Sequence, residues 1–255
     1  VLRGSGVDAV QAQRIYVGGF EPLADRHGFL LVYPEGFEKH WNDCRKAAPY
    51  SANTADIDDV GFLRAVVGDL VRRDGADPAR AFVTGFSNGG QMALKLAFEA
   101  PDDFAAIAAV GASHPTTDNC DCTDSGRPAN LMILNGDADP INPYQGGEVI
   151  PRPQTSFGTV IGTEASAEVW AQRIDAGAPV TRVYDDVDPS DGTVVARRDW
   201  TGAGRHVALV TIWGGGHVLP HPQSNPPPML GAGNRDLNGA ELIWDFFSRA
   251  DPSGN

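Results

Sequence analysis

The 255-residue sequence is poor in cysteine, methionine and basic residues, and it has no long apolar run. No stretch approaches the roughly 20 apolar residues that a membrane-spanning helix needs, so we expect no membrane partner. Lys and Arg number 20 against 33 Asp and Glu, for a formal net charge of −13, and no basic run interrupts this acidic balance. Because a nucleic-acid backbone would be repelled by such a chain, we expect no nucleic-acid partner either.

Three cysteines are too few for a disulfide-rich scaffold, and they make no convincing zinc site without a histidine at ligand spacing. Cys120 and Cys122 are too close in sequence to bridge each other comfortably. We therefore expect one of them to pair with Cys44 in an oxidising compartment, and the alternative is that all three are reduced. The sequence shows no signal peptide, but Val1 is not an initiator methionine, which fits a leader removed either by processing or by trimming of the sequence.

Short apolar, β-rich segments alternate with helical patterns, which predicts parallel strands joined by crossover helices. The expected strands are 29–34, 81–86, 104–112, 131–136, 181–187, 193–200 and 206–213. The first expected helix begins after an N-cap at Thr54 or Asp56 and reaches Val71. The other expected helices are 90–100, 164–174 and 236–250. The Pro-rich stretch 219–234 is expected to be a long loop, either at the rim of a site or merely connecting. With no internal repeat or linker, we expect residues 1–255 to form one domain.

The sequence GFSNGG, residues 85–90, contains the pattern G-x-S-x-G. The pattern alone is weak, but here it directly follows a predicted strand and opens a predicted helix. That is the strand–turn–helix elbow that exposes a nucleophilic serine above a sheet. The context predicts Ser87 as the nucleophile and leaves the amide of Asn88 free to donate to an oxyanion. The alternative is a structural serine in a tight turn.

A serine hydroxyl needs a neighbouring base, which in this arrangement follows the nucleophile and an acid along the chain. His217 comes directly after a predicted strand, behind three glycines, and is the expected base; His221 in the Pro-rich loop is the alternative. Asp139 follows the strand 131–136 and is the expected acid, with Asp137 interpreted as a solvated turn residue. In these roles Asp139 holds the imidazole tautomer and His217 transfers the proton.

A second oxyanion donor normally comes from a loop after an earlier strand. Here the segment VLRGSG stands at the start of the sequence, which makes the amide of Gly4 or Ser5 the candidate. Arg3 stands where many such enzymes have histidine. Among the aromatic residues, Trp41, Tyr144 and Trp213 are candidates for a wall that holds an acyl or phenolic group, and a core or surface position is the alternative for each.

With these residues in place, the chain resembles the polyhydroxybutyrate depolymerase and feruloyl esterase-like family of α/β-hydrolases. The motifs that carry the resemblance extend through nearly the whole chain: PLADRHGFLLVYPEG, WNDCR, DDVGFL, GFSNGG, NGDADPINPY, GGGH and ELIWDFF. The resemblance implies an α/β-hydrolase fold, with a mostly parallel sheet flanked by helices. The family's leading strands normally precede the loop at which this sequence begins, so we expect the sheet to lack its first edge strands or numbering to start after a lost segment.

The same resemblance implies a secreted, cofactor-independent esterase with the triad Ser87, Asp139 and His217. Its substrates would be hydroxyalkanoate esters, or phenolic and acyl esters of plant polysaccharide. Acyl transfer or peptide hydrolysis on the same triad, or a non-catalytic binding module, are the alternatives. We expect no metal site, because the acidic residues Asp56, Asp58 and Asp59 are of the kind that a helix N-terminus attracts.

Overall fold

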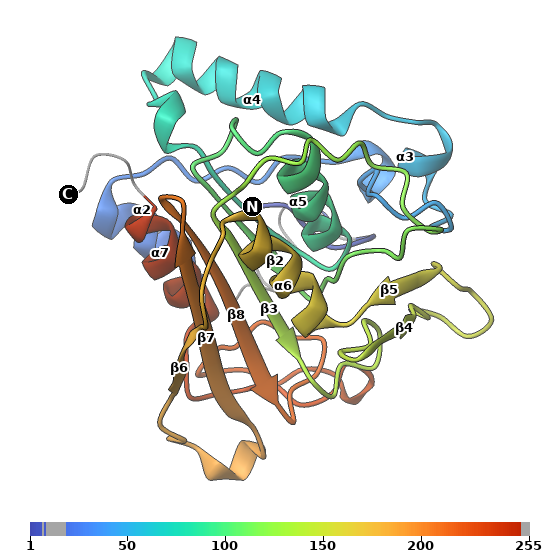
Figure 1. The fold of residues 1–255 in the computed structure, drawn as a ribbon, viewed down its shortest axis with the longest axis vertical. Helices are drawn as coiled ribbons and strands as arrows, with labels where there is room; N and C mark the ends of the chain where they lie inside the picture. Colours follow the sequence, from blue (N-terminus) through green and yellow to red (C-terminus); the bar gives the residue numbers. More distant parts are fainter. Residues whose placement is uncertain (7, 9–18, 251–255) are drawn as a thin grey trace.

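The computed structural model describes residues 1–6, 8 and 19–250. In this part of the chain a six-stranded sheet forms the centre of the molecule (Figure 1). Its strand order is β1 (Phe82–Phe86), β2 (Ala106–Val110), β3 (Leu131–Gly136), β8 (Arg205–Trp213), β7 (Val194–Gly202) and β6 (Val180–Val183). No described helix is long and apolar enough to cross a membrane.

The first four strands of that order pair in parallel, and β7 and β6 continue the sheet in antiparallel fashion. Parallel strands require crossover connections, so the loops that follow β1, β2, β3 and β8 all meet at the same edge of the sheet. In open sheets of this kind ligands bind at that edge. The prediction of a mostly parallel sheet flanked by helices is confirmed.

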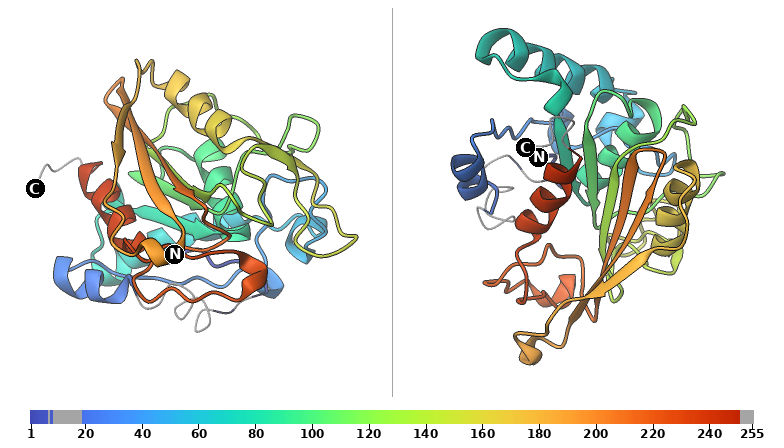
Figure 2. Two further views of the ribbon diagram at one scale, coloured as in Figure 1. Left: turned by 90° about the horizontal axis from the view of Figure 1, so that it is seen from below. Right: turned by 60° about the vertical axis from the view of Figure 1, so that its left-hand side comes forward.

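Helices cover both faces of the sheet, as Figures 1 and 2 show. Alternate side chains of each strand point to opposite faces, so Leu131 and Ile133 of β3 enter one core cluster and Met132 and Leu134 the other. The first core contains residues of α4 (Asp59–Asp74), α5 (Asn88–Glu99) and α6 (Thr163–Arg173). The second contains residues of α2 (Glu21–His27) and α7 (Gly239–Arg249).

Smaller elements surround the carboxyl edge. The strands β4 (Gly146–Glu148) and β5 (Thr159–Ile161) form an antiparallel pair, and α3 (Ser51–Thr54) is one short helical turn. A third apolar cluster joins them: Ala48, Tyr50, Val149, Phe157 and Val160. Single 3-10 turns occur at η1 (Phe37–Lys39), η2 (Pro78–Arg80), η3 (Pro189–Asp191) and η4 (Pro228–Leu230).

The prediction of a buried strand at 29–34 is wrong. This segment has no regular strand structure, and Leu30 is 55% exposed. In this segment the carbonyl oxygen of Val32 accepts a hydrogen bond from the N-terminal ammonium of Val1 over 2.8 Å. The neighbouring Leu2 forms a single bridge to Gly85 of β1. A strand needs a ladder of such pairs, and a run of apolar residues alone cannot supply the partner.

Two helices begin later than the sequence pattern predicts, because a different residue caps each of them. Asp58, not Thr54 or Asp56, is the N-cap of α4, and its carboxylate accepts from the amide of Gly61. Asn238 caps α7 and accepts from two amides of its first turn. Side-chain caps of this kind satisfy the free amides at a helix start. The strand expected at 181–187 is also shorter in the structure, where β6 ends at Val183.

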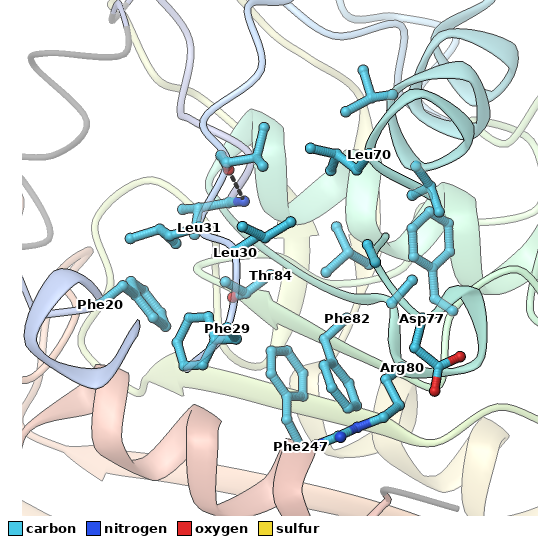
Figure 3. A pocket seen from close by; sticks show the side chains of 18 of the residues that line it. Phe20, Phe29, Leu30, Leu31, Leu70, Asp77, Arg80, Phe82, Thr84 and Phe247 are labelled. Atoms are coloured by element: carbon cyan, nitrogen blue, oxygen red, sulfur yellow. Dashed lines mark hydrogen bonds between the residues drawn. The ribbon is translucent and has the colours of Figure 1, made fainter. Parts of the chain in front are cut away.

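A cavity of about 520 Å³ lies beside β1, between α4, α7 and the segment 28–34 (Figure 3). Its lining is mainly apolar and includes Phe20, Phe29, Leu30, Phe82 and Phe247. None of the predicted catalytic residues lines it. The predicted catalytic residues instead follow the carboxyl ends of β1, β3 and β8.

A disulfide joins Cys44 to Cys122, with the two Cα atoms 5.0 Å apart and a sequence separation of 78. Such a long closed loop restricts the unfolded chain, so reduction should lower the free energy of unfolding by about 3–4 kcal/mol. Guanidinium unfolding with and without a phosphine reductant measures this. Cys120 is a free thiol, and Cys120→Ser should leave the oxidised midpoint unchanged. An unchanged midpoint after full reduction would contradict the expectation.

His114 is buried, and its Nε2 accepts from the indole Nε1 of Trp170 over 2.8 Å. Burial lowers the pKa of His114 to about 3, with Arg173 adding to the effect. Between pH 6.5 and 3 the unfolded chain therefore binds a proton that the folded chain does not, and stability falls with falling pH. The contribution is at most about 1.4 kcal/mol per pH unit.

His114→Gln retains an oxygen that can accept from Trp170 but removes the titrating group. We expect urea unfolding of this variant to depend less steeply on pH between 6 and 4 than that of wild type. The same slope in both proteins would assign the acid sensitivity to other groups.

Candidate active site

Ser87 occupies a strained turn between β1 and α5. Its backbone angles are φ 56° and ψ −119°, a region that side-chain-bearing residues rarely adopt and that costs roughly 1–3 kcal/mol. A Cβ at Gly85 would collide with the carbonyl of Gly89, and one at Gly89 with the backbone of Leu2. The two glycines of the motif therefore permit the turn, which leaves Ser87 partly exposed at the end of β1. This is the strand–turn–helix elbow that the sequence predicts.

His217 and Asp139 come together from two different loops. The imidazole Nδ1 lies 2.6 Å from Asp139 Oδ2, and both residues are buried. The other carboxylate oxygen, Oδ1, accepts from the amides of Ile141 at 2.7 Å and Asn142 at 2.8 Å. With its carboxylate so fixed, Asp139 favours the tautomer with hydrogen on Nδ1. The Nε2 atom is then an acceptor, and it makes no hydrogen bond to any described residue.

The imidazole packs against the residues that flank the elbow. The rings of Phe86 and His217 are 4.7 Å apart, and Phe86 directly precedes Ser87. A Cβ at Gly111 would lie 2.8 Å from Cε1 of His217, the atom bonded to both ring nitrogens. Gly111 in turn follows Val110, whose carbonyl accepts from the amide of Ser87. The structure thus brings the three predicted triad residues to one place at the carboxyl edge.

The alternatives to Asp139 and His217 are engaged elsewhere. Asp137 is partly exposed, and its carboxylate accepts from the amide of Gly214 at the end of β8. His221 accepts through Nδ1 from the amide of Gln223 within its own loop. Neither arrangement resembles a paired acid and base. The geometry favours Asp139 and His217.

The candidate oxyanion donors also lie at the elbow. Gly4 is buried against it, and a Cβ there would lie 3.5 Å from Cβ of Ser87. Asn88 is the first residue of α5, where the amide has no acceptor within the helix. Arg3, at the position where many such enzymes have histidine, is buried and donates to the carbonyl of Gly36 and to Glu35. Its side chain thus links the N-terminal loop to the segment 35–36.

The three candidate aromatic residues differ in exposure. Trp41 has no exposed surface, and its indole donates to the carbonyl of Arg3, so it cannot form part of an open wall. Tyr144 is 3% exposed, and its hydroxyl lies 2.6 Å from that of Thr211. Trp213 is 43% exposed and packs against the Tyr144 ring. In this structure neither Trp41 nor Tyr144 presents open ring surface, whereas Trp213 does.

Two polar groups near the site were missed by sequence reasoning. Asn135, within the apolar strand β3, donates to Thr163 and to the backbone of Ala112, and Asn142 donates to Ser113. Together they tie the Asp139 loop to the end of β2. A polar residue in an otherwise apolar strand was the available signal. The second group is the buried ion pair of Asp43 and Arg45 in the motif WNDCR.

Burial shapes the electrostatics of the two tyrosines around the site. It raises the pKa of Tyr50, against the opposing effect of Arg45. Burial likewise raises the pKa of Tyr144. Both phenols therefore stay neutral around neutral pH.

The sequence is similar to a known protein family and to several named proteins. The sequence model of the prolyl oligopeptidase family matches residues 45–130, a stretch that contains Ser87. "Putative esterase NocK" of Nocardia uniformis subsp. tsuyamanensis is 32% identical, over 97% of this chain and 72% of that protein. Feruloyl esterase C of Emericella nidulans is 26% identical over 87% of this chain, which spans 65% of its length.

Among solved structures, an acetyl xylan esterase from Aspergillus awamori superposes with a TM-score of 0.57 at 16% sequence identity. The match covers 96% of this chain and 86% of that one. At this identity the likeness concerns the fold, which is that of the α/β-hydrolases. The sequence relationship to the Nocardia protein extends over most of both chains. The chain therefore belongs to the family of α/β-hydrolase esterases that includes this Nocardia protein and the feruloyl esterases.

Proposed function

We propose that this chain hydrolyses carboxylic esters through an acyl-enzyme on Ser87. The observation that carries the proposal is the Asp139–His217 hydrogen bond, which leaves Nε2 of a buried imidazole without a partner beside the elbow. As the Ser87 Oγ attacks the ester carbonyl, His217 Nε2 takes its proton and then gives it to the leaving alcohol. Water, activated by the same nitrogen, attacks the acyl-enzyme and releases the acid.

The developing oxyanion would be bound by the amide of Asn88 and by that of Gly4 or Ser5. Backbone donors preorganised in this way are each worth on the order of 10²–10³ in rate. Asp139 does not touch the substrate; it orients His217 and stabilises the imidazolium that forms. No cofactor enters these steps.

For the substrate class we propose short acyl or phenolic esters, including feruloyl and acetyl esters of plant polysaccharide. The names of the relatives support this class, and the exposed ring of Trp213 offers a surface on which an aromatic group can stack. We further propose that residues 1–255 act as one catalytic domain in a secreted protein. The disulfide supports an oxidising compartment.

Hydrolysis of p-nitrophenyl acetate, butyrate and octanoate, and of methyl ferulate, tests the proposal. We expect turnover without added metal or cofactor, with the preference among chain lengths reporting the size of the acyl site. A peptide p-nitroanilide serves as the comparison for the peptidase alternative. The proposal would be contradicted if the protein hydrolysed the anilide but none of the esters. It would also be contradicted if the protein hydrolysed none of these compounds.

A further inference from the structure

A buried ion pair lies directly behind the elbow. Asp43 has no exposed surface, and Arg45 is 3% exposed. The Asp43 carboxylate accepts four hydrogen bonds: from the backbone amide, Nε and Nη2 of Arg45, and from Nδ2 of Asn88 at 2.7 Å. Asp43 thus holds the side chain of the residue whose amide is the first candidate oxyanion donor.

The Asn88 side chain is fixed from its other side as well. Its Oδ1 accepts from the amide of Trp41 at 2.8 Å, and its Nδ2 also donates to the Trp41 carbonyl at 3.1 Å. The side-chain amide of Asn88 thus pairs with both backbone groups of Trp41, as a neighbouring strand would. Asn88 can therefore shift only if the segment 41–45 shifts with it.

The same segment reaches the second candidate donor. The indole of Trp41 donates to the carbonyl of Arg3, the residue before Gly4, at 3.0 Å. The Arg45 guanidinium also lies over the ring of Tyr50. One contiguous set of buried contacts thus joins Asn88 to the loop that carries Gly4 and Ser5.

The segment is anchored independently of the elbow. Cys44, between the two ion-pair residues, is bonded to Cys122. The side chain of Asn53 donates to the carbonyls of Asp43 and Arg45, and the amide of Asn42 donates to Asp59. A buried ion pair adds little net stability compared with apolar residues of the same size. A geometric role accounts better for its place here.

We propose that Asp43 and Arg45 are positioning residues that set the separation of the two oxyanion donors. The proposal rests on the proposed function of Ser87. Oxyanion donors act at 2.7–3.1 Å from the charge that they stabilise, and displacements of about 0.5 Å already weaken them. Loosening the pair should therefore lower transition-state stabilisation while leaving ground-state binding of the ester unchanged.

Asp43→Asn and Arg45→Lys test this. Asparagine removes the charge at constant shape, and lysine keeps the charge but loses the planar, forked donor. We expect kcat for p-nitrophenyl butyrate to fall roughly 10- to 100-fold in each, about the cost of impairing one oxyanion donor, with KM within about twofold. A trifluoromethyl ketone, which forms a tetrahedral oxyanion on the serine, should lose affinity by the same factor as kcat/KM. An isosteric amide that cannot form one should bind as in wild type.

Asp199→Asn is the matched control. Asp199 and Arg197 form an ion pair with the same two-residue spacing on the sheet strand β7, away from the elbow. We expect this variant to lose stability but keep kcat. If it lowers kcat as much as Asp43→Asn does, a general loss of stability explains both, and the proposal is overturned.

The remaining outcomes are also decisive. If Asp43→Asn and Arg45→Lys fold and keep kcat within twofold of wild type, the positioning proposal is overturned. Turnover by wild type still supports the proposed ester hydrolysis in that case. A wild type without esterase activity overturns both. Should Asp43→Asn fail to fold, Arg45→Lys alone decides: parallel losses of kcat and ketone affinity support the proposal, and unchanged values overturn it.

Discussion

We expect Ser87→Ala to lower kcat/KM for p-nitrophenyl butyrate by roughly 10⁴- to 10⁶-fold, because the members of the proposed triad would act as a unit. Without the hydroxyl no acyl-enzyme forms, and only the oxyanion donors and substrate binding are left to accelerate hydrolysis. The melting temperature should change little. The strained backbone at position 87, with φ 56°, is equally unfavourable for serine and for alanine.

Ser125→Ala is the control for this experiment, because Ser125 is exposed and lies in a loop outside the carboxyl-edge site. It should match wild type in both rate and stability. If Ser87→Ala retains activity within tenfold, Ser87 is not the nucleophile. If it is inactive because it is unfolded, circular dichroism reveals this and a cysteine at position 87 replaces it in the test.

Asp139→Asn should lower kcat by about 10⁴-fold at pH 7. The amides of Ile141 and Asn142 both donate to Oδ1, so an asparagine must place its own oxygen there. Its NH₂ group then faces Nδ1 of His217 and donates to it. The imidazole is held in the tautomer with hydrogen on Nε2, which cannot accept the proton of Ser87.

Asp137→Asn is the matched control two residues away. Its carboxylate accepts one amide, that of Gly214, and an asparagine oxygen can still do so. We expect activity within a few-fold of wild type. A large loss in Asp137→Asn combined with a small loss in Asp139→Asn would reverse the assignment of the acid.

The elbow and the loops that carry the three candidate triad residues could be predicted from the sequence, because both depend on local features. A strand that is followed directly by G-x-S-x-G and a helix predicts a sharp turn at the serine. The glycines indicate that there is no space for a Cβ atom beside this turn. The acid and the base each follow a strand whose apolar composition is easily recognised. Parallel pairing of these strands then brings their carboxyl ends together without further information.

The contacts of the segment 41–45 could not be predicted in the same way. Asp43 and Asn88 are 45 residues apart, and their hydrogen bond depends on how the loop folds back over α5. Trp41 is likewise buried by the loop of Arg3, a tertiary contact that leaves no periodic signal. In the segment 29–34 the sequence pattern predicted too much structure. Its apolar residues indicate a strand, but the neighbouring backbone that the structure describes forms only isolated hydrogen bonds and no continuous strand pairing.

Labelling with a fluorophosphonate tests the central claim most directly. The reagent phosphonylates an activated serine, and intact-mass spectrometry followed by peptide mapping counts and locates the adducts. We predict one adduct per chain, on Ser87, absent in Ser87→Ala and in protein unfolded by guanidinium before labelling. No adduct on folded wild type, or an adduct on another serine, would contradict the account.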